Sequence, residues 1–147
     1  MTHPRFAFIK ARWHDDIVDQ AFAGFTEIVD PAHVDAFDVP GAFEIPLLAR
    51  DLAASGRYAA VIGAAFVVDG GIYRHEFVSA TVVDALMRVQ LEAGSPVLSL
   101  VLTPKSYQET PAHNAFFRDH FVTKGREAAD AALALTSLRA AAAAEAA

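Results

Sequence analysis

Two short segments of the chain combine residue types that can bind a small molecule and move its protons. Residues 39–46 read VPGAFEIP and place the carboxylate of Glu44 shortly after a glycine. Residues 69–78 read DGGIYRHEFV and set paired glycines before an Arg-His-Glu run at 74–76. Histidine titrates near neutrality, so this run is suited to proton transfer. The two segments predict a site that holds a polyol or heterocycle in one part and an anion in the other.

Each of these features also has a simpler structural explanation. Glu44 falls at a predicted helix start, where the helix dipole alone favours an acid. The glycines at 70–71 either bring the backbone close to an anion or form an ordinary tight turn. The run at 74–76 is equally compatible with a solvated first helical turn. Trp13, the only tryptophan, follows the first predicted strand and either stacks on a flat heterocycle or packs within a loop.

Three histidines raise the question of a metal site. His75, His113 and His120 lie in or near the polar segments of the chain. The chain has no cysteine, and these histidines lack the close pairing that is typical of zinc sites. We therefore expect no metal, no disulfide and no thiolate catalysis.

Strand and helix patterns alternate along the chain and would position these segments. Buried strands are predicted at residues 6–9, 34–39, within 58–68 and at 97–102. Helices are predicted from Asp15, from Pro46, through 78–89 and from Gly125, with a loop and a short helix at 103–120 and a frayed tail at 140–147. This order predicts one α/β domain, residues 1–147, with a parallel four-stranded sheet and helices on both faces. Ligands of such sheets bind at the carboxyl ends of the strands, where both segments fall.

Composition disfavours several classes of protein. Hydrophobic residues make up 54% of the chain and charged residues 20%, which is typical of a folded domain. A net charge of −6 disfavours nucleic acid as a partner. No apolar run approaches the roughly 18 residues of a membrane span, and the amino-terminal sequence does not resemble a signal peptide, so we expect a cytoplasmic protein. The apolar bias and the two open edges of the sheet predict a homo-oligomer.

The two segments resemble those of the 6,7-dimethyl-8-ribityllumazine synthase (lumazine synthase) family, and the resemblance extends from Phe6 to about Arg139. VPGAFEIP is its most specific mark, and residues 66–78 resemble the second branch of the family, whose members tend to form decamers of two pentamers. The better-known branch forms pentamers or icosahedral shells. The resemblance implies a flavodoxin-like three-layer sandwich. It also implies condensation of 5-amino-6-(D-ribitylamino)uracil with 3,4-dihydroxy-2-butanone 4-phosphate, with no metal or organic cofactor.

The resemblance also implies roles for individual residues. Trp13 would stack on the pyrimidine, and Glu44 would bind the ribityl chain through its carboxylate. Further ribityl contacts would come from Ala42 and Phe43, further pyrimidine contacts from Phe66, Val67, Val68 and Ser99, and backbone contacts to the phosphate from Gly71 and Ile72.

The sequence departs from the better-known branch at the catalytic segment. That branch carries Arg-Gly-x-Thr-x-His-Phe-Asp, and a gapless match puts Asp69 at its arginine and Arg74 at its histidine. Arginine stays charged and is a poor proton shuttle, although it can stabilise negative charge. We therefore predict His75 as the proton carrier and keep Arg74 as the second candidate. The family's phosphate-binding arginine has no clean counterpart; His113 falls closest, and Lys124 matches a family lysine.

Two other functions remain open from the sequence. A flavin-binding protein would use the same pocket for riboflavin without turnover, and the altered catalytic segment motivates it. A purely structural assembly protein would bind neither substrate, and the apolar composition motivates it. Trp13 and Glu44 argue against the structural protein, because an idle pocket has little reason to keep a stacking ring and a ribityl-binding acid. The enzyme is the best supported of the three functions.

Overall fold

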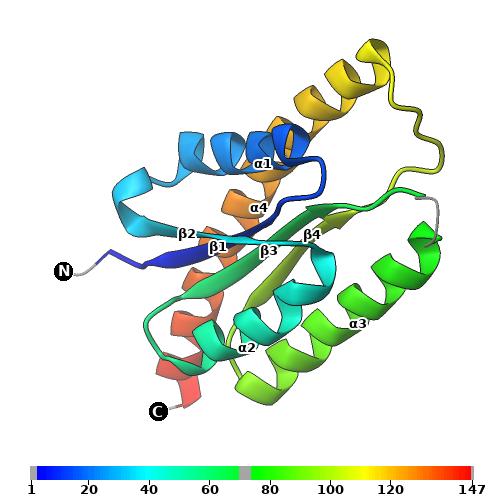
Figure 1. The fold of residues 1–147 in the computed structure, drawn as a ribbon. Coiled ribbons are helices and arrows are strands. Elements are labelled where there is room, and N and C mark those ends of the chain that lie inside the picture. Colours follow the sequence, from blue (N-terminus) through cyan, green and yellow to red (C-terminus); the bar gives the residue numbers. More distant parts are fainter. Residues whose placement is uncertain (1–2, 70–73, 147) are drawn as a thin grey trace.

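A four-stranded parallel sheet forms the middle layer of the molecule (Figure 1). The computed structural model describes residues 3–69 and 74–146. The strands lie in the order β2-β1-β3-β4. Their bounds are β1 Phe6–Ala11, β2 Val34–Val39, β3 Ala60–Phe66 and β4 Val97–Leu102. The predicted parallel sheet is confirmed, and each predicted strand segment coincides with one of these strands.

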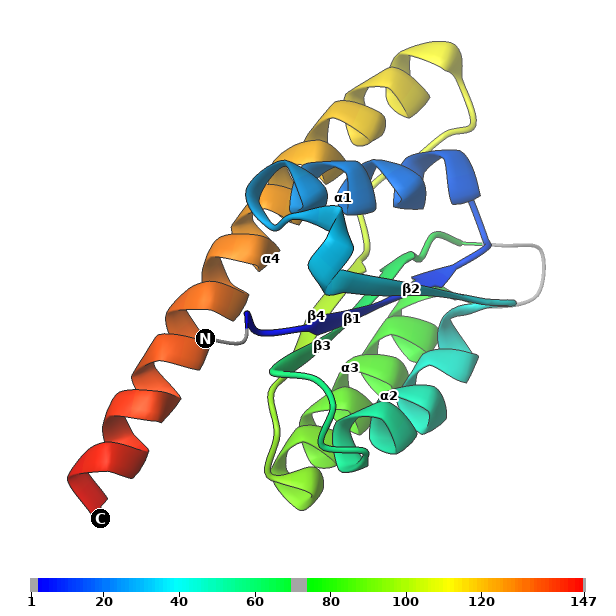
Figure 2. The same cartoon turned by 90° about the vertical axis from the view of Figure 1, so that its left-hand side faces the viewer.

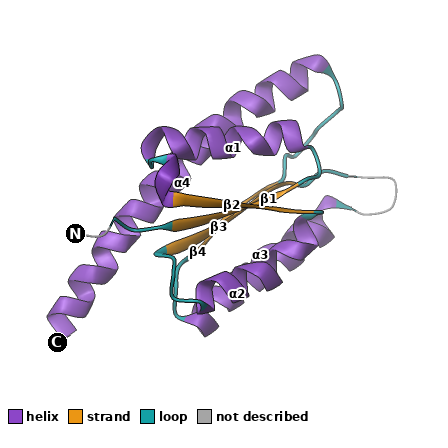
Figure 3. Cartoon of the chain, turned by 60° about the vertical axis from the view of Figure 1, so that its left-hand side comes forward, coloured by secondary structure: helices purple, strands orange, loops and turns teal. Residues whose placement is uncertain are grey.

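Two helices cover each face of the sheet, which gives three layers (Figures 1 and 3). Helices α1 and α4 lie on one face, and α2 and α3 lie on the other. The bounds are α1 Asp15–Ile28, α2 Ile45–Ala54, α3 His75–Ala93 and α4 Pro111–Ala146, with short 3₁₀ turns at Pro31–His33 and Ala42–Glu44. This strand order with helices on both faces is the predicted flavodoxin-like arrangement. No helix in the described residues is long and apolar enough to cross a lipid bilayer.

Alternating side chains of the strands build one apolar cluster on each face of the sheet. Phe6 and Phe8 of β1 pack with α1 and α4, whereas Ala7 and Ile9 pack with α2 and α3. All seven residues of β3 are buried, as expected for a central strand that is covered on both faces. Full burial of a phenylalanine such as Phe6 or Phe8 stabilises the fold by roughly 1.5–3 kcal/mol. The core therefore fixes the strand ends from which the loops of the site begin.

The last helix begins earlier than the sequence predicts. We expected a loop with a short helix at 103–120 and a helix from Gly125, but α4 begins at Pro111 and runs through Gly125 without a break. A Cβ at Gly125 would overlap the carbonyl oxygen of Ala21 in α1, and a Cβ at Gly24 would overlap the carbonyl oxygen of Val122 in α4. Gly125 is therefore a site of close helix contact and not a helix boundary.

The alanine-rich end of the chain is helical where a frayed tail was predicted. Helix α4 continues to Ala146, and the side chains of residues 140–146 are exposed. Figure 2 shows this end of α4 running past the edge of the sheet. Alanine has the highest intrinsic helix propensity, so the helix continues although this end buries no side chain.

Candidate active site

The loops that follow β1 and β3 line a cavity at the carboxyl edge of the sheet. Its volume is about 410 Å³, which is in the range of small-molecule sites. The lining side chains come from the ends of both strands and from α3: Trp13, His14, Phe66, Val67, Val68, Asp69 and Val78. Most of them are apolar, and two are aromatic. The arrangement suits a flat heterocycle whose polar edge faces a few polar groups.

The indole of Trp13 is held in place by the VPGAFEIP segment. A Cβ at Gly41 would lie 2.5 Å from Cε2 and Cζ2 of the indole, so only glycine lets the ring lie this close to the backbone. The ring of Phe43 meets the indole edge to face, with centroids 6.4 Å apart. Trp13 keeps 40% of its surface exposed. The segment therefore supports one side of the indole and leaves surface free for a ligand.

Glu44 lies at the end of the 3₁₀ turn, just before α2. Its backbone N–H donates to the carbonyl oxygen of Gly41 over 3.2 Å. Within residues 3–69 and 74–146, no side chain or backbone group forms a hydrogen bond or ion pair with its carboxylate. Glu44 does not line the 410 Å³ cavity, whereas its neighbour Ala42 is fully buried beneath the turn. An exposed carboxylate beside Phe43 can accept hydrogen bonds from ligand hydroxyls.

His14 is a candidate site residue that the sequence analysis missed. It lines the cavity and precedes α1 with a φ of 52° and a ψ of 50°, a left-handed conformation that is uncommon outside glycine. Among the described residues other than glycine, it is the one with a positive φ. Its ring lies 5.5 Å from that of Phe66 and 5.6 Å from that of Tyr107, edge to face in both cases. Such backbone strain often accompanies function.

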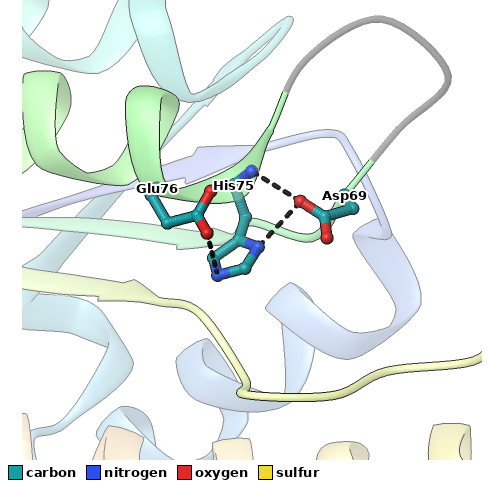
Figure 4. Close-up of side chains that lie close together, drawn as sticks. All are labelled: Asp69, His75 and Glu76. Atoms are coloured by element: carbon teal, nitrogen blue, oxygen red, sulfur yellow. Dashed lines mark hydrogen bonds and ion pairs between the residues drawn. The ribbon is translucent and has the colours of Figure 1, made fainter.

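Asp69, His75 and Glu76 form a cluster between the end of β3 and the start of α3 (Figure 4). One carboxylate oxygen of Asp69, Oδ1, lies 2.8 Å from the backbone N of His75 and 2.8 Å from its Nδ1. The backbone N–H of His75, and then its imidazole, lower the pKa of Asp69. On the other side of the ring, Nε2 lies 3.9 Å from Oε1 of Glu76. The imidazole is thus anchored on its Nδ1 side.

A second, smaller cavity adjoins the first at Val68 and Asp69. Its volume is about 180 Å³, and its lining is more polar: Val68, Asp69, His75, Pro104, Lys105, Ser106 and Tyr107. His75 therefore lines a polar cavity that adjoins the apolar one. Lys105 and Ser106 were not predicted, because the segment that carries them follows β4 and meets β3 only in the folded chain.

Arg74 is placed differently from His75. It is the residue before α3, and its side chain is 71% exposed, against 19% for that of His75. Its guanidinium lies 5.6 Å from the ring centroid of Phe77 and 3.8 Å from Oε2 of Glu76. Arg74 lines neither of the two cavities.

Four predicted residues lie away from these cavities or outside the described residues. Ser99 is in the middle of the edge strand β4, where its Oγ accepts a 3.3 Å hydrogen bond from the backbone N of Val101. Lys124 is in α4, paired with Glu127 at 2.9 Å. Gly71 and Ile72 lie outside the described residues. Their predicted roles stay predictions.

The predicted phosphate ligand His113 lies in the first turn of α4. Its Nδ1 accepts a 2.9 Å hydrogen bond from the backbone N of Gln108, and its ring lies 6.1 Å from that of Tyr107. In the described part of the chain, His75, His113 and His120 form no metal-ligand group. Asp69, His75 and Glu76 do bring three ligand atoms within 4.8 Å of one another.

Comparison with known proteins gives the family. The sequence model of the 6,7-dimethyl-8-ribityllumazine synthase family matches residues 3–140. The chain belongs to the lumazine synthase family. It is 57% identical over 132 residues to 6,7-dimethyl-8-ribityllumazine synthase of Rhodococcus erythropolis, covering 86% of this chain and 85% of that protein.

Two further relatives are named 6,7-dimethyl-8-ribityllumazine synthase 2. The protein of Pseudomonas syringae pv. tomato is 56% identical over 135 residues, which cover 87% of this chain and 79% of the relative. That of Bradyrhizobium diazoefficiens is 51% identical over 140 residues, which cover 89% and 85%. The predicted resemblance to lumazine synthases is confirmed, and with it the predicted enzyme class, a transferase of riboflavin biosynthesis.

Proposed function

We propose that this chain condenses 5-amino-6-(D-ribitylamino)uracil with 3,4-dihydroxy-2-butanone 4-phosphate to give 6,7-dimethyl-8-ribityllumazine. Family membership supports the reaction. The observation that carries the site is the pairing of two cavities: an apolar one beside Trp13 and a polar one beside His75. The first suits the pyrimidine, and the second suits the polar butanone phosphate.

The pyrimidine would stack on the indole of Trp13 and make apolar contacts with Val67 and Val68. Stacking on an aromatic side chain contributes about 1–3 kcal/mol per base-sized ring. The ribityl chain would extend toward Glu44, whose exposed carboxylate accepts hydrogen bonds from hydroxyl groups.

The reaction needs proton transfers and no redox partner. The 5-amino group attacks the butanone carbonyl, and loss of water from the carbinolamine gives an imine. Inorganic phosphate then leaves as an enol forms, and the enol takes up a proton on carbon to become a ketone. The ribitylamino nitrogen attacks this ketone and closes the ring with loss of a second water. Holding both substrates together contributes most to the rate enhancement, because proximity alone can lower the activation barrier by several kcal/mol. His75 carries protons in these steps, and acid–base help adds about 10²–10⁴-fold.

The test mixes the purified protein with both substrates and follows lumazine formation optically against an enzyme-free control. Turnover above the spontaneous rate is expected, and His75→Ala should slow it by about 10²–10⁴-fold without abolishing it. His33→Ala is the matched control, because His33 lies at the amino end of β2, at the opposite edge of the sheet. Absence of turnover together with tight riboflavin binding would instead support the flavin-binding alternative.

We also propose that the protein is a homo-oligomer built from pentamers, with a decamer as the expected assembly, and that it works in the cytoplasm. Apolar side chains on the outer side of α3 support an interface: Val83, Met87 and Leu91 recur at every fourth residue and are 37%, 54% and 73% exposed. Such a stripe is unusual on a free surface. Light scattering should give an oligomer for the unchanged protein and for Glu92→Gln, and a smaller species for Met87→Glu. A monomeric unchanged protein would refute this proposal.

A further inference from the structure

We propose that Asp69 is a positioning residue for His75. Its carboxylate holds the imidazole in the tautomer that carries hydrogen on Nδ1, so that Nε2 presents a free lone pair to the substrate. The inference rests on the proposed function, in which His75 carries protons. In this role Asp69 acts through His75 and not on the reacting atoms.

The tautomer follows from the 2.8 Å contact between Oδ1 of Asp69 and Nδ1 of His75. An ionised carboxylate has no hydrogen to donate, so a hydrogen bond at this distance requires the hydrogen to be on Nδ1. In the neutral ring, Nε2 is then unprotonated and can accept a proton. The lowered pKa of Asp69 keeps its carboxylate ionised near neutral pH.

The orientation of the ring is fixed by a second hydrogen bond to the same oxygen atom. The backbone N of His75 donates to Oδ1 of Asp69 over 2.8 Å, at the first residue of α3. Backbone and ring of one residue thus share one acceptor, which ties the imidazole to the start of the helix. Rotating the ring away would break the bond to Nδ1 while the backbone bond held Oδ1 in place.

Within residues 3–69 and 74–146, the other ring nitrogen has no hydrogen-bond partner. Nε2 lies 3.9 Å from Oε1 of Glu76, a distance too long for a hydrogen bond. His75 lines the polar cavity, which shares Val68 and Asp69 with the apolar cavity. A hydrogen-bonded Nδ1 and an Nε2 without a partner among the described residues form the arrangement that a histidine base requires.

The first experiment is a double-mutant cycle on the full-length protein with both substrates. Asp69→Asn removes the negative charge, and its amide can either accept from Nδ1 or donate to it, so the preference for hydrogen on Nδ1 weakens and the lone pair on Nε2 is free for a smaller fraction of the time. We expect a loss in kcat no larger than that of His75→Ala, within about 10²–10⁴-fold, and little change in KM. The double variant should be no slower than His75→Ala alone. Losses that multiply would overturn the proposal.

The second experiment reads the tautomer directly and needs no turnover. NMR of the imidazole nitrogens, in protein labelled at its histidines and at a pH where the ring is neutral, assigns the His75 signals by their loss in His75→Ala. Hydrogen on Nδ1 is expected in the unchanged protein and in the control Glu76→Gln, and a shift toward Nε2 in Asp69→Asn. Hydrogen on Nε2 in the unchanged protein would overturn the proposal even if Asp69→Asn failed to fold.

Failure of the proposed function and failure of the proposed role of Asp69 give different results. An unchanged protein without turnover would refute the proposed function, and with it the proton transfer that Asp69 is inferred to assist. Normal turnover combined with multiplied losses, or with the other tautomer, would refute the role of Asp69 and leave the proposed function standing.

Discussion

Replacing Gly41 by alanine tests whether the indole of Trp13 is the stacking surface of the proposed site. The added Cβ would lie 2.5 Å from Cε2 and Cζ2 of the indole. Carbon contacts are ordinary from about 3.4 Å, so the ring must move by about 0.9 Å or leave its position. Trp13 is 40% exposed and can rotate outward, whereas the carbonyl of Gly41 is held by the backbone N–H of Glu44. We therefore expect the indole of Trp13 to move and the backbone at Gly41 to keep its position.

The expected loss is one of affinity and not of stability. A base-sized ring that stacks on an aromatic side chain gains about 1–3 kcal/mol, so losing the contact weakens binding of the ribitylaminouracil by roughly fivefold to 150-fold. Trp13 would move into solvent without straining the core. The Tm of Gly41→Ala is accordingly expected to stay close to that of the unchanged protein.

Calorimetric titration with the ribitylaminouracil gives the affinity, and the emission of Trp13, the only tryptophan, reports its position. We expect weaker binding and more solvent-like emission in Gly41→Ala. Trp13→Phe is the matched background, because the shorter ring has no atom at Cζ2; there, adding Gly41→Ala should change the affinity little. Unchanged affinity and unchanged emission in Gly41→Ala would refute the reasoning.

Three further predictions concern stability. Gly125→Ala should lower the Tm, because overlap with the backbone of Ala21 costs about 1–3 kcal/mol; a higher Tm would mean that helix propensity outweighs the close contact. Arg12 donates two 3.0 Å hydrogen bonds that lower the pKa of Asp19 below its unfolded value of about 4, so their contribution is present above about pH 4 and lost as the pH falls through the folded pKa. Urea unfolding of Asp19→Asn should therefore show lower stability near neutrality and a shallower decline in acid; parallel curves for both proteins would contradict this. Deleting residues 140–147, whose described side chains are exposed, should leave Tm and turnover unchanged, and a clear loss of either would show that this end has a partner.

The sheet could be predicted because its signal is local. Residues 60–66 are apolar without a break, since a central parallel strand is covered on both faces. The rule that ligands bind at the carboxyl ends of strands depends only on where strands stop, and it predicted a site at this edge with Trp13 as a candidate. The resemblance to lumazine synthases added Val67 and Val68, and these three residues line the same cavity.

Three features of the structure were not predicted, and each has its own physical reason. Gly125 has the same local signal as a helix boundary, and only the approach of α1 to α4 explains why a glycine stands inside the helix. Asp69 and His75 are six residues apart, and no periodic pattern in the sequence predicts that their side chains meet. His14 was missed because its left-handed conformation is set by the turn between β1 and α1 and not by residue type.

The structure also bears on the choice between Arg74 and His75 as the proton carrier of the proposed reaction. A gapless match to the better-known branch favours Arg74 by position, but its side chain is 71% exposed and lines neither cavity. His75 is 19% exposed, lines the polar cavity and has an acceptor on Nδ1. A base must both reach the substrate and keep a fixed orientation, and a guanidinium that stays charged cannot take up a proton. The one-residue offset from the family motif thus has a physical consequence: the histidine begins the helix, and Asp69, where that branch carries an arginine, can accept its Nδ1 hydrogen.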